Sequence, residues 1–199
     1  MGGVALFVSN LNWLDPQITP LVPVLKSYWL MIHVSVVTAS YGFFGICAAC
    51  GIASLAATAF GRNLRELRAI NEMAMIVGLA LLTAGIFFGA VWANESWGRY
   101  WGWDPKETWA LITMFAYALA THSRHIPRLD GPFAFDVLSV VCFSTVLMTF
   151  FGVNYYLSGL HSYGHSGGVS LTVPLIGASV VIALIAAAAG RYFKTSKKR

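Results

Sequence analysis

The sequence predicts an all-α integral membrane protein with about five transmembrane helices, and three observations lead to this prediction. The 199 residues are 57% hydrophobic and 11% charged, whereas about 25% charged is usual for soluble domains. The apolar residues form long stretches, near the roughly 20 residues that a helix needs to cross the hydrocarbon core. Most cationic residues lie in short segments between these stretches. A bilayer takes up such surface when the backbone closes its own hydrogen bonds as helices.

Five stretches of the chain meet the length criterion. They cover residues 29–60, 73–93, 108–122, 133–155 and 170–189. The first is long enough to tilt or to project beyond the bilayer, and the third is short. The third begins at Asp104-Pro-Lys-Glu107, which has the pattern of a helix start with Asp at the N-cap, Pro at the first position and Glu in a capping box. We therefore expect Asp104 and Glu107 to fix this helix start rather than to perform acid–base chemistry.

The net charge of +5 is distributed as an orientation signal, which argues against a nucleic-acid partner. One set of connecting segments carries ten Lys and Arg residues and the other carries three, Lys26, Arg99 and Lys106. Cytoplasmic loops carry the excess of positive charge, so we expect the N-terminus outside and the C-terminus inside. The predicted parts are an extracytoplasmic segment 1–28, a transmembrane domain 29–193 with outer loops 94–109 and 156–169, and a basic cytoplasmic tail 194–199. Residues 1–10 lack the basic region of a signal peptide, so no cleaved leader is expected.

The three cysteines are expected to be small packing residues. Cys47 and Cys50 form a CxxC pair inside the first predicted helix and are followed by Gly51, so the CxxCH pattern of haem attachment is not met. Buried free Cys behaves mainly as a small hydrophobe. Cys142 also lies in an apolar stretch and is interpreted in the same way.

The most unusual segment is the first outer loop, which carries four tryptophans in thirteen residues. They are Trp97, Trp101, Trp103 and Trp109. One interpretation is an interfacial aromatic belt. A belt does not need the interspersed Gly98 and Gly102 or the cations Arg99 and Lys106, however. These residues favour instead a platform for a flat, apolar, anionic molecule such as a porphyrin with two propionates. The indoles offer flat faces, the glycines allow the molecule to approach the backbone, and the cations can pair with its carboxylates.

The predicted topology sorts the histidines into two groups. His33, His161 and His165 lie at the outer side, so His33 and His161 could both ligate a haem iron on the platform, with His165 in reserve. Taken singly, each could instead be a structural or solvated residue. The spacing of His161 and His165 also allows a local metal pair, which a glycine-rich loop would hold poorly. His122 lies 16 residues after Lys106, which is about 25 Å along a helix, so it cannot share the outer iron. It either ligates a second haem or caps the inner end of the third helix. His125 belongs to an inner loop.

These motifs together resemble a known family. The tract WGRYWGWDPKETWAL (97–111) resembles the "WWD" domain of haem-handling proteins. With LVPVLKSYWLMIHV (21–34) before it and GLHSYG (159–164) after it, the chain resembles the CcsA (ResC) subunit of System II cytochrome c synthases. Members of this family generally carry further membrane helices before the 21–34 motif, whereas 20 residues precede it here, so the chain is interpreted as a compact or a truncated form.

The resemblance implies a role in cytochrome c biogenesis. It implies that haem b, as substrate, binds outside at the WWD tract with His33 and His161 as axial ligands. It assigns His122 to an inner haem site that a CcsB-type membrane subunit completes. The family exports haem and promotes thioether bonding to the CxxCH cysteines of apocytochrome c, acting as a haem lyase that works mainly by positioning its reactants. The implied location is the bacterial cytoplasmic membrane, or the thylakoid membrane in a plastid.

Two alternatives use the same residues differently. A haem exporter or chaperone of the CcmC type would bind haem on the platform without attaching it. A haem-containing respiratory subunit would place facing histidines in the middle of its helices, and no histidine of this sequence lies there. No residue has the pattern of a catalytic nucleophile.

Overall fold

The structure, a computed structural model, describes residues 26–157, 159–161 and 171–196, and the regular structure of these residues is entirely helical. This confirms the all-α prediction. Residues 1–25, His165 and the end of the basic tail lie outside the described residues. The elements in chain order are α2 (Tyr28–Ala59), α3 (Arg65–Trp97), α4 (Pro105–Thr121), the 3₁₀ turn η2 (Ser123–His125), α5 (Pro132–Val141), α6 (Phe143–Leu147), the π turn η3 (Met148–Gly152), α7 (Val153–Tyr156) and α8 (Thr172–Ser196).

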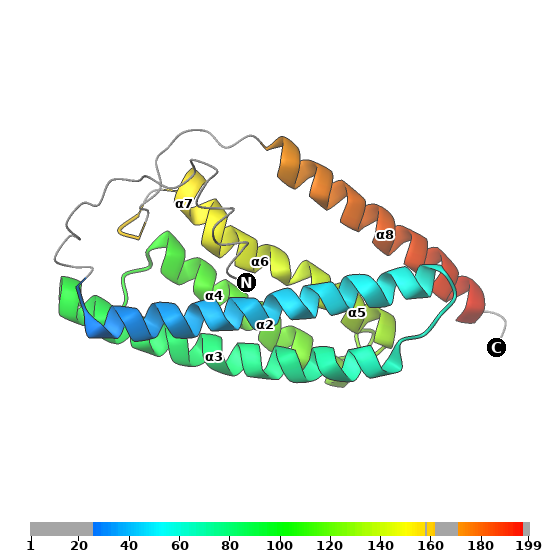
Figure 1. Ribbon diagram of the computed structural model, residues 1–199, viewed down its shortest axis with the longest axis horizontal. Helices are drawn as coiled ribbons and strands as arrows, with labels where there is room; N and C mark the ends of the chain where they lie inside the picture. Colours follow the sequence, from blue (N-terminus) through cyan, green and yellow to red (C-terminus); the bar gives the residue numbers. More distant parts are fainter. Residues whose placement is uncertain (1–25, 158, 162–170, 197–199) are drawn as a thin grey trace, which may run out of the picture.

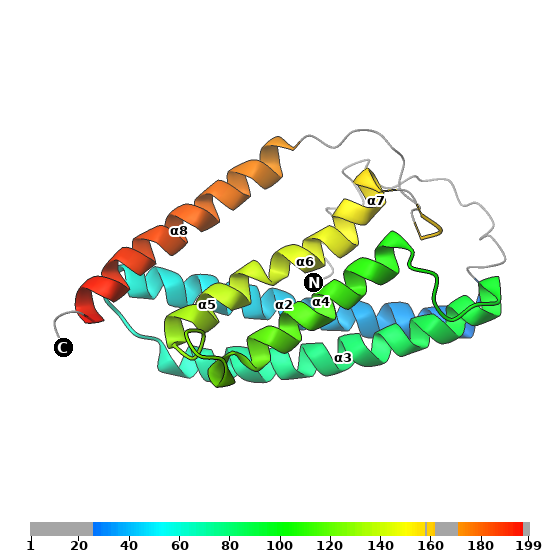
Figure 2. The same cartoon turned by 180° about the vertical axis from the view of Figure 1, so that it is seen from behind.

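The long helices run alternately in opposite directions (Figure 1). The start of α2, the end of α3, the start of α4 and all of α7 lie toward one end of the bundle. The end of α2, the start of α3, the end of α4 and the start of α5 lie toward the opposite end, as the reverse view in Figure 2 also shows. The helix connections that carry most of the arginines therefore share one end. This is the separation of charge on which the predicted orientation depends, and the direction of the chain across the membrane stays a prediction.

Four helical stretches of the described chain are long and apolar enough to cross a membrane. They are Tyr28–Ala59, Arg65–Trp97, the continuous run Pro132–Tyr156, and Pro174–Thr195. Helix α4 has 17 residues, about 25 Å at 1.5 Å per residue, which is less than the roughly 30 Å of a hydrocarbon core. The number of five spanning helices therefore also stays a prediction.

Two helices extend beyond the predicted apolar stretches. Helix α3 begins eight residues before residue 73, because the polar segment Arg65–Glu72 is helical although hydropathy does not detect it. It also runs on to Trp97, and α4 begins at Pro105, so the predicted outer loop 94–109 is a connection of residues 98–104 between two helix ends. Helix α8 reaches Ser196, so the first part of the predicted tail is helical.

The core joins α2, α3, α4 and the α5–α6 region. Phe44 of α2 and Tyr117 of α4 stack with ring centroids 3.6 Å apart, and both are fully buried. Cys47, Cys50 and Cys142 are buried free thiols, and two of them belong to this core. This confirms the prediction that the cysteines are packing residues.

The run from α5 to α7 is interrupted by η3, a wide π turn. Such turns are rare and occur often at functional sites. Here the turn places the buried Thr149 hydroxyl 3.0 Å from the hydroxyl of Thr113 in α4. One turn later, Asn154 lies near the start of α4. The π turn therefore positions two polar side chains beside the end of the bundle where the predicted outer histidines lie.

Candidate functional site

His33 and His161 line one pocket, although 128 positions separate them in the sequence. The pocket lies where α2 and α4 begin. Apolar residues of α2 and α3 line part of it, together with Tyr100, Trp101 and Lys106. The structure thus brings the two outer histidines to one pocket, and their role as iron ligands stays a prediction.

The ring of His33 is held by α3. Its Nδ1 lies 2.7 Å from the carbonyl oxygen of Gly85, and since a carbonyl only accepts, Nδ1 carries the proton and Nε2 keeps a lone pair. The ring also lies parallel to Trp92, with an interplanar angle of 8° and centroids 6.5 Å apart. Gly89 faces the ring so closely that a Cβ at that position would lie 2.7 Å from Cε1 of His33. Helix α3 therefore fixes the tautomer and the orientation of this imidazole.

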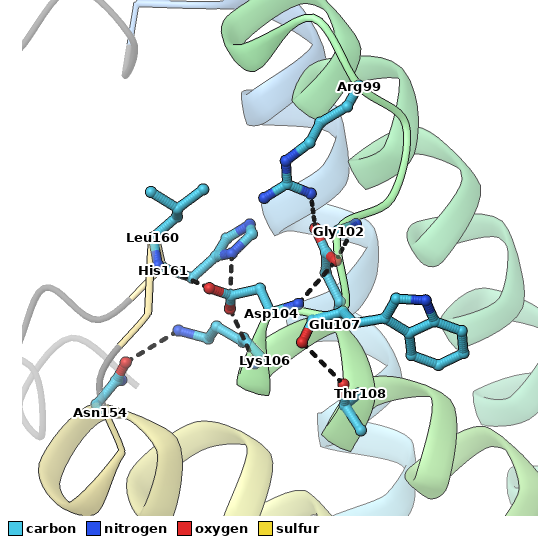
Figure 3. Close-up of polar contacts among 10 residues, drawn as sticks. Arg99, Gly102, Asp104, Lys106, Glu107, Thr108, Asn154, Leu160 and His161 are labelled. Atoms are coloured by element: carbon cyan, nitrogen blue, oxygen red, sulfur yellow. Dashed lines mark hydrogen bonds and ion pairs between the residues drawn. The ribbon is translucent and has the colours of Figure 1, made fainter.

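The ring of His161 is held by Asp104, the residue directly before α4. Its Nδ1 donates to Oδ1 of Asp104 at 3.1 Å, while the backbone N–H of Leu160 donates to Oδ2 at 2.7 Å (Figure 3). The carboxylate is almost fully buried, with 4% of its side chain exposed. Burial lowers the pKa of His161, and the negative charge of Asp104 acts in the opposite direction. The neutral imidazole that results again has its lone pair on Nε2.

The predicted capping box at the start of α4 is confirmed. Oδ1 of Asp104 accepts from the backbone N–H of Lys106 at 3.0 Å. Oε2 of Glu107 accepts in return from the N–H groups of Asp104 and Gly102, at 3.1 and 2.8 Å. The same aspartate thus starts the helix and contacts the histidine loop, a second contact that local sequence does not reveal.

The four tryptophans of the WWD tract are not equivalent. Trp97 packs edge-on against His161, with centroids 4.8 Å apart, and Trp101 lines the pocket. Trp103 is 69% exposed and has a positive φ of 57°, and Trp109 is half-buried on α4 outside the lining of this pocket. The structure therefore brings two of the four predicted indoles to the histidines.

Sequence reasoning missed Trp92, which is almost completely buried between the two histidines. Its ring centroid lies 5.5 Å from that of His161 and 4.8 Å from that of Trp97. The residue ends an apolar stretch, where a single aromatic carries no signal beyond membrane insertion. Its spacing of five residues from Trp97 gives no signal either, because residues that share a helix face are three or four positions apart.

The two predicted cations also differ. Lys106 lines the pocket, and its Nζ donates to Oδ1 of Asn154 at 3.1 Å. The Arg99 guanidinium lies 3.4 Å from Oε1 of Glu107 and 5.8 Å from the ring of Trp97, and it is not among the residues that line the pocket. Of these two cations, Lys106 is thus the one that lines the pocket. Figure 3 shows its contact with Asn154 and the contact of Arg99 with Glu107.

His122 lies at the other end of α4, as predicted. It is exposed and forms the C-cap of the helix, with Nδ1 2.8 Å from the carbonyl oxygen of Ala118. His125 follows in η2 and is also exposed. The residues that the structure describes contain no group of three His, Cys, Asp or Glu side chains able to hold a metal ion by themselves.

Comparison with known families agrees with the motifs. A family described as cytochrome c assembly protein matches residues 1–161. The chain belongs to this family. The match includes both pocket histidines and the whole WWD tract.

Individual relatives agree as well. The chain is 52% identical over 171 residues to Protein NrfI of Wolinella succinogenes, which covers 82% of this chain and 19% of that protein. It is 40% identical over 156 residues to the cytochrome c biogenesis protein CcsA of Chlamydomonas reinhardtii, and this match covers 74% of this chain and 44% of that protein. It is 35% identical over 210 residues to CcsA of Gloeobacter violaceus, and this match covers 75% of this chain and 62% of that protein. The resemblance to CcsA is therefore confirmed, and the chain spans between a fifth and two thirds of the length of these relatives.

Proposed function

We propose that this chain acts in cytochrome c biogenesis by binding haem, as substrate, between His33 and His161 and presenting it for covalent attachment to apocytochrome c. One observation carries the proposal. Two imidazoles from distant segments line the same pocket, and each has its Nδ1 bound to an oxygen acceptor. Metal-binding histidines almost always use their second nitrogen in this way.

The other residues of the pocket suit a porphyrin. Trp97 and Trp101 offer aromatic surface beside the imidazoles, and Lys106 offers a charge for a propionate. Haem supplies the reactive vinyl groups, and the chain contributes proximity and orientation. Imidazole ligands on both faces would also protect the iron until the histidine of the apocytochrome replaces one of them.

The pocket has a cavity volume of about 90 Å³ and is partly open. On this proposal the porphyrin ring extends through the mouth of the pocket, or the segments that carry His33 and His161 move apart when it binds. The contact between Lys106 and Asn154 joins α4 to α7 beside the pocket. We infer that this contact opens when a propionate takes its place on Lys106.

His122 is proposed as a ligand of an inner haem site. It is exposed at the opposite end of the bundle, and its Nε2 is available because Nδ1 contacts the helix backbone. A CcsB-type membrane subunit would supply the second ligand. Haem would then pass from the inner end to the pocket at the outer end of a bacterial cytoplasmic or thylakoid membrane.

The test is haem binding by the full chain, purified with its CcsB-type partner from membranes. We expect an absorption spectrum typical of bis-histidine haem, and loss of the outer haem in His33→Ala and in His161→Ala. His125→Ala is the matched control, because His125 is exposed at the far end and should leave the spectrum unchanged.

Two results would contradict the proposal in different ways. Wild-type spectrum and haem content in both single variants would show that the outer site is elsewhere. Haem bound by both histidines, but no thioether product when reduced apocytochrome c is added to the complex, would favour a haem exporter or chaperone over a synthase subunit.

A further inference from the structure

Asp104 makes more contacts than a helix cap requires. An N-cap needs one side-chain oxygen to accept from the first turn, and Oδ1 meets this need by accepting from the N–H of Lys106 at 3.0 Å. The same oxygen also accepts from Nδ1 of His161, and Oδ2 accepts from the N–H of Leu160. Two of the three donors therefore belong to the segment that presents the histidine.

The close contact between this carboxylate and the histidine segment depends on a glycine. A Cβ on Gly159 would collide with Oδ2 of Asp104 and lie 2.9 Å from Cδ of Pro105. A buried carboxylate is costly unless hydrogen bonds satisfy it, and at the start of α4 these bonds come from the backbone on one side and the histidine segment on the other. The arrangement holds the His161 ring to the rigid end of a helix.

The two imidazoles of the pocket differ in the acceptor that each one faces. Nδ1 of His33 donates to a neutral backbone carbonyl, whereas Nδ1 of His161 donates to a carboxylate. A charged acceptor forms the stronger hydrogen bond and withdraws the Nδ1 proton further, which makes Nε2 the better electron donor to a metal.

We infer that Asp104 is a positioning residue that orients His161 and strengthens it as an iron ligand, so that the two faces of a haem in this pocket are bound unequally. The inference depends on the proposed function. It adds that the capping aspartate of the WWD tract sets the affinity and the reduction potential of the bound iron through His161, beyond starting α4.

The test compares two substitutions that both keep a good N-cap, Asp104→Ser and Asp104→Asn. Serine is too short to reach His161 and has no second oxygen. Asparagine keeps the size and one acceptor oxygen for Lys106 and His161, but it removes the charge and replaces the oxygen that accepts from the N–H of Leu160. Each variant of the full chain is made in a His122→Ala background, to exclude haem at the inner end. It is titrated with ferric haem, and the midpoint potential of the bound haem is measured.

We expect Asp104→Ser to bind ferric haem about 10–100-fold more weakly, the usual effect of losing such a second partner. Asp104→Asn should bind with intermediate affinity and should have a higher midpoint potential than the His122→Ala parent, because weaker donation stabilises ferric iron less. Gly159→Ala should likewise weaken haem binding and raise the midpoint potential, although it changes neither of the two interacting side chains. Asp130→Asn, an exposed aspartate at the other end, is the charge control and should change neither.

The outcomes separate this inference from the proposal on which it depends. If Asp104→Asn, which keeps the cap and the side-chain size, has the affinity and potential of the parent, Asp104 only starts the helix and the inference is overturned. If the parent chain itself binds no haem through His33 and His161, the proposed function fails, and the inference fails with it. A raised potential in Asp104→Asn supports the inference even if Asp104→Ser does not fold.

Discussion

Arg68 of α3 and Asp136 of α5 form a two-pronged ion pair inside the bundle. Nε and Nη2 of Arg68 lie 2.9 and 2.7 Å from Oδ2 of Asp136, and Nε is also 3.0 Å from Oδ1. The aspartate side chain is fully buried and that of the arginine is 17% exposed. This pair joins two helices at the end of the molecule opposite the histidine pocket.

Asp136→Ala should destabilise the chain by about 3–5 kcal/mol, because it leaves a largely buried guanidinium without its partner. The double variant Arg68→Met/Asp136→Leu should recover most of this loss, since it removes both charges. The measurement is unfolding of the purified protein in detergent by added SDS, followed by tryptophan fluorescence.

The control for this prediction is Asp130→Ala, at an exposed position near the same end. Its free energy of unfolding should stay within about 0.5 kcal/mol of the wild type. A similarly small change in Asp136→Ala would mean that the ion pair adds nothing to stability beyond what water would supply to Arg68.

The predicted orientation can be tested by labelling with a membrane-impermeant maleimide in intact cells. The native Cys47, Cys50 and Cys142 are 0%, 8% and 5% exposed, so they should not react and need not be removed. We expect Glu95→Cys, near the histidine pocket, to be labelled from outside. His125→Cys and Lys194→Cys should be labelled only after the membrane is made permeable, and the reverse pattern would invert the assignment of outer and inner ends.

Much of the fold follows from local sequence signals. Apolar stretches place α2, α3, the α5–α7 run and α8, because transfer into lipid depends on composition and length alone. The start of α4 follows from four consecutive residues whose caps are local hydrogen bonds. The shared location of His33 and His161 follows from alternation of the helices, which needs no knowledge of packing.

The remaining features depend on contacts between distant segments. The bond from Asp104 to His161 joins residues 57 positions apart, so no local pattern encodes it. Sequence treats Arg99 and Lys106 alike, and only packing against Glu107 or against the pocket distinguishes them. The polar first turns of α3 are helical because of contacts such as that of Arg68 with Asp136, which hydropathy does not report.

Gly89→Ala should weaken haem binding while leaving the bundle folded. The added methyl carbon would lie 2.7 Å from Cε1 and 2.8 Å from Nδ1 of His33, so the ring must turn away from its acceptor at Gly85. Alanine favours a helix over glycine by about 1 kcal/mol, so overall stability should not fall greatly. We expect roughly a 10-fold loss of affinity or more, measured by titration with ferric haem.

The matched control is Gly42→Ala in α2, where an added Cβ meets nothing within 4 Å. It should keep the affinity of the wild type and match or exceed its stability. Wild-type affinity and spectrum in Gly89→Ala would show that the orientation of His33 by α3 is not needed for binding.

Lys106→Gln should reduce affinity for haem but not for haem dimethyl ester. The Lys106 side chain lines the pocket, and its Nζ reaches Asn154 across to α7. A hydrogen bond to a charged group contributes about 1.5–3 kcal/mol, so we expect the loss for free haem to be roughly 10–100-fold. The ester has no propionate charge, so wild type and variant should bind it equally.

Arg99→Gln should have the smaller effect on free haem, because Arg99 is already paired with Glu107. If Lys106→Gln weakens binding of haem and ester by the same factor, the lysine acts by holding α7 through Asn154 and does not pair with a propionate.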